Sequence, residues 1–430
     1  MKAYCPEEFF SRSELDKVQK TRLATTLERA ARSEFYGRRF AEMGVRPEAI
    51  TSAADITRLP FTTKDDLRSA YPARMLTRPV TDMVRLHASS GTTGSATVIY
   101  YTRNDIDSWA DLMARCMHMV GVRAEDTFQN MSGYGLFTGG LGIHYGAERL
   151  GCLTIPAGAG NSKRQLKLLE DFNVSVIHII PSYALHLGTV KDELGYTPDR
   201  LNLRVALIGA EPHTAAIRQR IEDVYGIKAY NSYGLSEMNG PGVAFECLEQ
   251  DGMHIWEDAY LPEIVDPETG EPLPDGEVGE LVITTLCREG MPLIRYRTKD
   301  LTRFIPGDCA CGRRHRRLDR IMGRADDMII LKGVNIYPMQ VEQVLMSIPE
   351  VGQNYLIVLE RDGYLDQMRV KVEVKEEYFV EDMRELKSLQ SRISSRLRDE
   401  ILITARIDLV EQNSLPKSEG KAQRVQDLRG

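Results

Sequence analysis

The densest group of residues that could bind an anion is Ser89-Ser-Gly-Thr-Thr-Gly-Ser95. Glycines let backbone amides approach an anion closely, and the serine and threonine hydroxyls add donors at short range. Residues 96–101 have the composition of a strand, so we expect a phosphate-binding loop that joins two strands. An ordinary Ser/Gly turn is the alternative. A Walker A loop is excluded, because no Gly-Lys-Ser/Thr ending is present.

A second group of residues could bind a metal ion. Cys309 and Cys311 form a tight pair of thiols, and Cys247 and His254 are seven positions apart and could flank a turn. Together they make a Cys₃His set that is sufficient for tetrahedral zinc, although the spacing is not that of a familiar zinc finger. His315 competes with His254 for the fourth place. Buried cysteines beside an unrelated histidine are the alternative.

Strands and helices alternate in the middle of the chain, where these residues must be positioned. Apolar, β-branched runs predict strands at 174–180, 204–208 and 280–285, and helical patterns occupy 164–172 and 214–225. Such alternation predicts an α/β fold with β-sheets layered under helices. The first seventy residues are polar and helix-prone, which predicts a helical cap.

The pattern changes after residue 323, which predicts a second domain. Strands are expected at 328–331, 354–359 and 368–374, and helices at 339–347 and 381–401. A chain of 430 residues is also longer than one hydrophobic core usually supports. We therefore predict a large N-terminal domain, residues 1–325, and a small, mobile C-terminal α+β domain, residues 326–430.

Composition excludes several classes of protein. The net charge of -7 argues against a nucleic-acid binder, which usually has a basic surface. Seven cysteines, an odd number spread along the chain, argue against a secreted disulfide framework. No stretch approaches the roughly 20 apolar residues of a membrane-spanning helix. We expect a soluble, cytoplasmic protein without nucleic-acid or membrane partners.

Six segments, in order along the chain, resemble the motifs of the adenylate-forming superfamily, which includes acyl-CoA synthetases, peptide-synthetase adenylation domains and luciferases. The ordered set is far more specific than any one motif. The chain departs from the pattern at Ser95, where many members have a lysine. The segments are the 89–95 loop, Gly209-Ala-Glu-Pro212, Asn231-Ser-Tyr-Gly-Leu-Ser-Glu237, Tyr296-Arg-Thr-Lys-Asp300, Gly323-Arg-Ala-Asp-Asp-Met328 and Leu415-Pro-Lys-Ser-Glu-Gly-Lys421.

The resemblance implies a set of nucleotide-binding residues. Tyr233 would stack on the adenine, Glu237 would hold Mg²⁺ through a hard oxygen ligand, and Asp300 would accept hydrogen bonds from both ribose hydroxyls. The residues implied to bind ATP or coenzyme A are Ser89, Ser90, Gly91, Thr92, Thr93, Gly94, Gly209, Ala210, Glu211, Pro212, Asn231, Ser232, Tyr233, Gly234, Asp300, Arg324 and Gly333.

The resemblance also implies residues that act in catalysis and domain motion. Lys421 would offset the charge that develops when the acid attacks the α-phosphate, and Glu237 and Arg324 would assist at the nucleotide. Asp326 would be the hinge between the two domains. Gly333 would let the thiol of coenzyme A pass close to the backbone.

The likeness is closest to the phenylacetate–coenzyme A ligases, through residues 131–146, 233–242 and 254–258. Tyr134 and Phe137 are candidates for an aryl pocket, with simple core packing as the alternative. The resemblance further implies that any zinc at Cys247, His254, Cys309 and Cys311 is structural, and that the protein is a homodimer.

The function implied is that of an ATP-dependent ligase, with Mg²⁺ as cofactor, which adenylates phenylacetate or a related aryl acid and passes the acyl group to coenzyme A. Two alternatives remain: an enzyme that uses another acceptor, such as a carrier protein or an amine, and a zinc-stabilised nucleotide-binding protein that has lost catalysis. The sequence does not identify the acid. Phenylacetate, a hydroxylated or indolic relative and a benzoate-like acid all fit.

Overall fold

The structure is a computed structural model that describes residues 3–89, 97–331, 334–362, 365–379, 383–415 and 424–429. The chain folds into two compact units. The first holds Met1–Ile179, Leu201–Ala210 and Tyr230–Arg320, and the second holds Ile180–Arg200, Glu211–Ala229 and Ile321–Gly430.

The largest sheet has nine strands in the order β13-β14-β9-β8-β7-β6-β5-β3-β4. Strands β4, β3, β5 and β6 run parallel, whereas β7, β8, β9, β14 and β13 pair antiparallel. The strands are β3 Thr127–Asn130, β4 Leu153–Ile155, β5 Val176–Ile179, β6 Val205–Gly209, β7 Lys228–Leu235, β8 Gly240–Glu246, β9 Met253–Ile255, β13 Phe304–Ile305 and β14 Arg317–Leu318.

The parallel strands form where the sequence is apolar without interruption. Every residue of β5 and of β6 is buried, as expected for parallel strands covered on both faces. The strands predicted at 174–180 and 204–208 are thus confirmed, with ends that differ by one or two residues. The structure also confirms a mixed α/β fold.

Helices begin at capping residues that the sequence supplies. Ser11, Thr63 and Thr102 form capping boxes at the starts of α1, α3 and α4, which satisfy backbone amides that have no partner within the helix. The predicted helical cap at the N-terminus is confirmed by α1, α2 and α3. The helices of the first unit are α1 Arg12–Ala31, α2 Glu34–Glu42, α3 Lys64–Ser69, α4 Arg103–Met119, α5 Thr138–Leu150 and α6 Ser162–Asp171.

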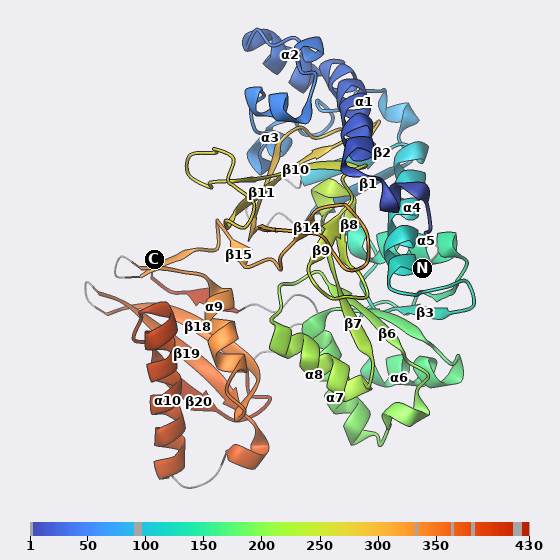
Figure 1. Ribbon diagram of the computed structural model, residues 1–430. Coiled ribbons are helices and arrows are strands. Elements are labelled where there is room, and N and C mark those ends of the chain that lie inside the picture. The colour runs from blue at the N-terminus through green and yellow to red at the C-terminus, as the bar shows by residue number, and fades with distance from the viewer. Residues whose placement is uncertain are drawn as a thin grey trace. The chain divides into compact units, whose positions relative to one another are not determined.

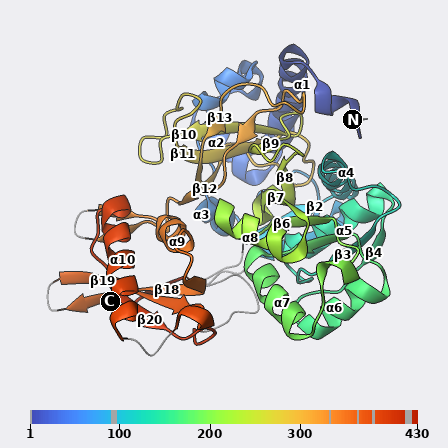
Figure 2. The ribbon, with the colours of Figure 1, turned by 60° about the horizontal axis from the view of Figure 1, so that its bottom comes forward.

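Two of these helices, α4 and α5, pack closely side by side (Figure 2). A Cβ atom at Gly142 would lie 2.2 Å from the Trp109 ring, and one at Gly146 would lie 2.4 Å from Met113 Cβ. These glycines of the 131–146 segment therefore serve contact between helices.

Two smaller antiparallel arrangements complete the first unit. Strand β11 pairs with β10 on one side and with β12 on the other, and β1 pairs with β2. The predicted strand at 280–285 is confirmed as β11. The bounds are β1 Arg85–Ser89, β2 Thr97–Tyr101, β10 Tyr260–Val265, β11 Gly279–Thr285 and β12 Tyr296–Thr302.

In the second unit, residues from Ile329 onward form a small α+β core. Its sheet has the order β20-β19-β18-β21, and α10 packs beside β20 (Figure 1). The strands predicted at 354–359 and 368–374 and both predicted helices are confirmed. The elements are β15 Gly323–Arg324, β16 Ile329–Leu331, β17 Val334–Ile336, α9 Pro338–Met346, β18 Val351–Asp362, β19 Leu365–Val374, α10 Met383–Ile401, β20 Arg406–Val410 and β21 Val425–Asp427.

The second unit also contains α7, Pro181–Glu193, and α8, Ala215–Tyr225. The Tyr225 hydroxyl donates a hydrogen bond to the carbonyl oxygen of Ala184, which joins the two helices. The predicted boundary between residues 325 and 326 stays a prediction. Among the described residues, no helix has both the length and the apolar character that spanning a bilayer requires.

Candidate active site

The predicted phosphate loop lies between two paired strands. Ser89 ends β1 and is opposite Thr97, which begins β2. The strand expected after the loop is therefore confirmed. Ser90, Gly91, Thr92, Thr93 and Gly94 lie outside the described residues, as does the side chain of Ser89.

The residues predicted to hold adenine and ribose lie in direct contact. The Tyr233 hydroxyl, on β7, donates a 2.7 Å hydrogen bond to Oδ2 of Asp300, on β12. Tyr233 is 7% exposed and Asp300 is 8% exposed. Sixty-seven residues separate them in the sequence, so the tertiary structure alone brings the ring and the carboxylate together.

Strand β12 is held in place around Asp300 by a buried carboxylate. Glu280, which is fully buried, accepts hydrogen bonds from Arg297 Nε at 3.1 Å and from the Lys299 amide at 3.1 Å. The Lys299 ammonium lies 3.5 Å from the same carboxylate. These contacts fix the backbone on both sides of Asp300.

Glycines allow the strands of the predicted adenine site to approach closely. A Cβ atom at Gly209 would lie 2.3 Å from the Ser232 carbonyl oxygen, and one at Gly234 would lie 1.7 Å from the Gly240 carbonyl oxygen. The next residue, Ala210, has a φ of 70°, which is uncommon without glycine. The structure thus brings Gly209 of one motif against Ser232 of another, whereas Gly234 lies against the next strand at Gly240.

Two other residues of these motifs are held by their neighbours. The amide of Asn231 donates to the Glu246 carboxylate at 2.8 Å. Glu211 accepts a 2.6 Å hydrogen bond from the amide of Ser182, and Pro212 follows it at the start of the turn into α8.

The predicted magnesium ligand Glu237 lies in a short 3-10 helix, Ser236–Met238, and is 6% exposed. Its Oε1 atom is 4.0 Å from Lys64 Nζ, on α3. Arg288, which is 2% exposed, donates to the Glu237 carbonyl oxygen at 2.9 Å and to Asn239 Oδ1 at 2.8 Å. Lys64 and Arg288 were not predicted from the sequence, because neither belongs to one of the six motifs and both are distant from Glu237 along the chain.

The aryl-pocket candidates differ in exposure. Phe137, at the start of α5, is 53% exposed, so the core-packing alternative is wrong for this side chain. Tyr134 is half-buried, which raises the pKa of its hydroxyl. That hydroxyl accepts a 2.9 Å hydrogen bond from Asn130 Nδ2 and lies 3.2 Å from Nδ1 of His144. The orientation of Tyr134 is therefore restricted from two sides.

The 131–137 segment is also fastened to the strand that leads into the phosphate loop. The Leu136 carbonyl oxygen accepts a hydrogen bond from the Ala88 amide at 3.0 Å and lies 3.0 Å from His87 Nδ1. Both partners are on β1. The candidate acid-binding segment and the phosphate loop thus extend from one hydrogen-bonded support.

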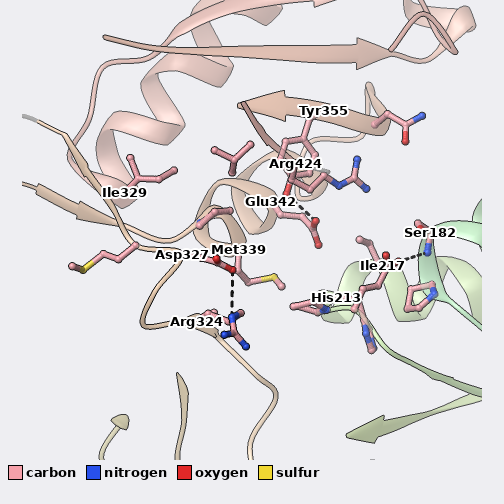
Figure 3. Close-up of a pocket in the computed structure, with 18 of the residues that line it drawn as sticks. Ser182, His213, Ile217, Arg324, Asp327, Ile329, Met339, Glu342, Tyr355 and Arg424 are labelled. Atoms are coloured by element: carbon pink, nitrogen blue, oxygen red, sulfur yellow. Dashed lines mark hydrogen bonds and ion pairs between the residues drawn. The ribbon is translucent and has the colours of Figure 1, made fainter. Parts of the chain in front are cut away.

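In the second unit, Arg324 and Asp326 form an ion pair with two contacts of 2.9 Å. Burial raises the pKa of the neighbouring Asp327. These residues border a pocket of about 510 Å³ (Figure 3). Its lining also includes Glu342, whose pKa burial raises, and Tyr355, whose hydroxyl donates to Glu342 at 2.9 Å.

The remaining predicted residues of this unit, Gly333 and Lys421, lie outside the described residues.

Comparisons with known proteins agree with this geometry. Residues 38–287 match the family model described as AMP-binding enzyme, and residues 333–429 match the AMP-binding enzyme C-terminal domain. The chain is 46% identical to the phenylacetate-coenzyme A ligase of Thermus thermophilus over 99% of both proteins. It is 45% identical to that of Escherichia coli K12, over 99% of this chain and 97% of the other.

The chain belongs to the phenylacetate–coenzyme A ligase family. A crystal structure of 2-hydroxyisobutyryl-CoA ligase in the postadenylation state, with R3-HIB-AMP, matches with a TM-score of 0.92 and 30% identity, over 98% of this chain and 91% of that one. These matches confirm the superfamily and the fold class, a large N-terminal sheet domain and a small C-terminal domain.

The four predicted zinc ligands of this family member lie together. The ligand atoms of Cys247, His254, Cys309 and Cys311 are all within 4.8 Å of one another. Strands β9 and β14 bring them into proximity, because His254 on β9 pairs with Arg317, which follows the two later cysteines. None of the seven cysteines forms a disulfide bond among the residues that the structure describes.

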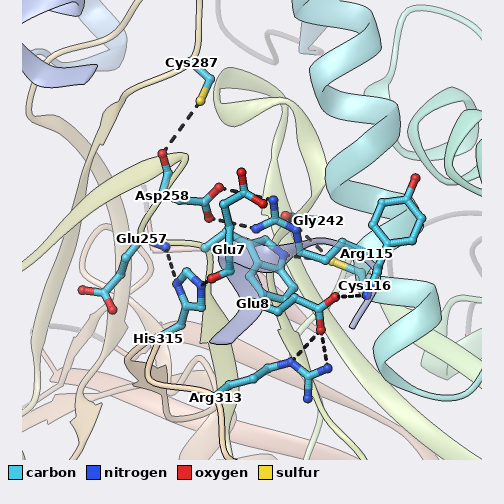
Figure 4. A network of polar contacts seen from close by, with 12 residues as sticks. Glu7, Glu8, Arg115, Cys116, Gly242, Glu257, Asp258, Cys287, Arg313 and His315 are labelled. Atoms are coloured by element: carbon cyan, nitrogen blue, oxygen red, sulfur yellow. Dashed lines mark hydrogen bonds and ion pairs between the residues drawn. The ribbon is translucent and has the colours of Figure 1, made fainter. Parts of the chain in front are cut away.

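His254, not His315, is the histidine of this cluster. His254 Nε2 lies 3.3 Å from Cys311 Sγ, and its Nδ1 atom is 3.0 Å from the His315 carbonyl oxygen. The ring of His315 is engaged elsewhere, since Nδ1 accepts from the Glu257 amide and Nε2 lies 2.9 Å from the Glu7 carbonyl oxygen (Figure 4).

The chemistry of the cluster suits zinc. A hydrogen bond with Cys247, assisted by His254, lowers the pKa of Cys311, which favours the thiolate form that binds a metal ion. Thiolates and imidazole are the ligands of structural zinc, and the His315 carbonyl orients His254 as an outer partner of such a site does.

A buried network joins this cluster to the N-terminus. Glu8, which is fully buried, accepts a 3.0 Å hydrogen bond from Arg313 Nε, and Arg115 pairs with Asp258 at 2.8 Å (Figure 4). Residues 7 and 8 are thereby fastened beside the cysteine-rich turn.

Proposed function

We propose that this protein is an AMP-forming ligase that joins phenylacetate, or a related aryl acid, to coenzyme A. The contact between Tyr233 and Asp300 carries the proposal, because it brings the adenine and ribose candidates of two distant motifs together. The names of the relatives support phenylacetate as the acid.

The reaction has two steps. The carboxylate of the acid attacks the α-phosphate of ATP, which forms an acyl adenylate and releases pyrophosphate. The thiol of coenzyme A then attacks the acyl carbon, which forms the thioester and releases AMP. Mg²⁺ held by Glu237 would neutralise phosphate charge in the first step.

The chain's own residues have separate tasks in this proposal. Tyr233 stacks on the adenine and Asp300 accepts from the ribose hydroxyls. Tyr134 and Phe137 contact the aryl group, and the restricted Tyr134 hydroxyl would select among ring substituents. Lys421 offsets charge at the α-phosphate.

Domain motion is the second part of the proposal. We assign residues 1–325 to a large domain and 326–430 to a mobile small domain that turns about Asp326 between the two steps. Arg324 would contact the nucleotide, and Gly333 would border the path of the thiol.

The experiment that tests the function is an assay of purified protein with a set of aryl acids, ATP, Mg²⁺ and coenzyme A. AMP and thioester formed together support the proposal. AMP or pyrophosphate without thioester would favour transfer to a carrier protein or an amine. No acid-dependent pyrophosphate would favour the nucleotide-binding protein without catalysis.

We also propose that Cys247, His254, Cys309 and Cys311 hold one structural zinc ion per chain. The ion would fasten β9 to the turn before β14 without contact with the substrates. Metal analysis of protein purified without chelator tests this, and a zinc content far below one equivalent per chain would contradict it. The proposed homodimer and its cytoplasmic location are to be tested by light scattering and by cell fractionation.

A further inference from the structure

The segment expected to bind phosphates contains no cationic side chain. From Ser89 to Thr102 the sequence has no lysine, arginine or histidine. The terminal phosphates of a nucleotide carry several negative charges, which protein sites commonly balance with a Lys or Arg as well as Mg²⁺. Another part of the chain must supply any such charge.

Lys64 is the lysine found beside the predicted magnesium ligand. Its Nζ atom lies 4.0 Å from Oε1 of Glu237, and its side chain is 40% exposed. Helix α3, which begins at Lys64, packs against β2, the strand that follows the phosphate loop. The ammonium group therefore lies beside Glu237, on a helix that packs against the strand after the predicted loop.

The position of Lys64 is well supported by the fold. Thr62 donates a 2.9 Å backbone hydrogen bond to Arg295 and accepts one of 2.9 Å from Arg297, so this segment is attached to β12. Thr63 then closes a capping box with Asp66. The root of the Lys64 side chain is thus connected to the strand that carries Asp300.

Local stability does not explain a lysine at this position. Lys64 is the first residue of α3, where the helix dipole disfavours a positive charge. At 4.0 Å, and with the Lys64 side chain 40% exposed, the ion pair with Glu237 contributes little to stability. The charge is better explained by a ligand than by the protein alone.

Among the described residues, Arg288 is a second cation near Glu237, but it is not free to bind a phosphate. Arg288 is 2% exposed, and its donors are directed to Glu237 O, Asn239 Oδ1 and the Tyr101 hydroxyl. Lys64 is exposed enough to reach a ligand, whereas Arg288 is buried and its donors are engaged by the protein.

We propose that Lys64 supplies the cation that the phosphate loop lacks and binds the phosphates of ATP beyond the α-phosphate, and then the released pyrophosphate. In the structure its ammonium faces Glu237. Mg²⁺ bound at Glu237 would repel the ammonium, which then turns to the phosphates. The proposal rests on the proposed function, since it concerns the same nucleotide site.

Isothermal titration calorimetry of the full chain with ATP, pyrophosphate and AMP, in the presence of Mg²⁺, tests the proposal. Lys64→Met should weaken the binding of ATP and of pyrophosphate by about tenfold, because it removes one charge-assisted hydrogen bond. The affinity for AMP should change less than twofold. Lys64→Arg should keep ATP affinity within about threefold. Lys20→Met, an exposed lysine of α1, is the matched control and should change none of them.

Three results would overturn the proposal: unchanged ATP and pyrophosphate affinity in Lys64→Met, an equal loss for AMP, or the same losses in Lys20→Met. Thermal unfolding of each variant verifies that it is folded. Failure of the unmodified protein to bind ATP would instead refute the proposed function, so the two failures are distinguishable.

Discussion

Tyr233→Phe removes one hydroxyl from the centre of the proposed nucleotide site and leaves the ring. The lost hydrogen bond is 2.7 Å long and ends on a carboxylate. Hydrogen bonds to charged groups contribute about 1.5–3 kcal/mol. The bond joins two side chains of the protein and not the nucleotide itself, so only the part that orients Asp300 affects nucleotide affinity. We expect AMP to bind about tenfold more weakly, which is about 1.4 kcal/mol.

The assay compares AMP with 2′,3′-dideoxy-AMP by isothermal titration. The substitution should act through the ribose hydroxyls. The affinity for the dideoxy nucleotide, which lacks both hydroxyls, should therefore fall less than twofold. Tyr225→Phe is the matched control, because Tyr225 also donates a buried 2.7 Å hydrogen bond, but to the Ala184 carbonyl oxygen. Unchanged AMP affinity, or equal losses for both nucleotides, would refute the link between Tyr233, Asp300 and the ribose.

Three further predictions concern positioning, metal and pH. Arg288→Gln leaves acceptors around Glu237 unpaired, so the Mg²⁺ concentration for half-maximal pyrophosphate release should rise about tenfold with KM for the acid unchanged; an unchanged Mg²⁺ requirement would contradict this. Cys311→Ser should lose zinc by metal analysis and lower Tm, whereas Cys152→Ser should keep the metal; equal zinc contents would contradict the site. Burial lowers the pKa of His178 from 6.5 to about 3, so the unfolded chain binds the proton more tightly. The contribution of neutral His178 to the free energy of unfolding is therefore fully present above pH 6.5. It decreases as the pH falls towards 3, by at most about 5 kcal/mol. The urea concentration at the midpoint of unfolding should therefore differ more between pH 4.5 and pH 7.5 in the unmodified protein than in His178→Asn. Equal differences in the two proteins would exclude His178 as the cause of the pH dependence.

The helices and strands were largely predictable, because they depend on local patterns. Two of the buried parallel strands are short apolar runs between polar segments, and α3 begins at a capping box that is visible in the sequence. The four zinc-ligand candidates were also identified from the sequence, since paired cysteines are unusual in a chain of this kind.

The sequence by itself determined which residues could act on a nucleotide, because their types and order match one family. Only the tertiary structure decided which side chains meet: Tyr233 with Asp300, Lys64 with Glu237, and His254 rather than His315 with the cysteines. It also decided that Phe137 is exposed and that Arg288 supports the Glu237 turn. The physical reason is that secondary structure follows from neighbours in the sequence, whereas contacts between residues far apart along the chain depend on how sheets and helices pack.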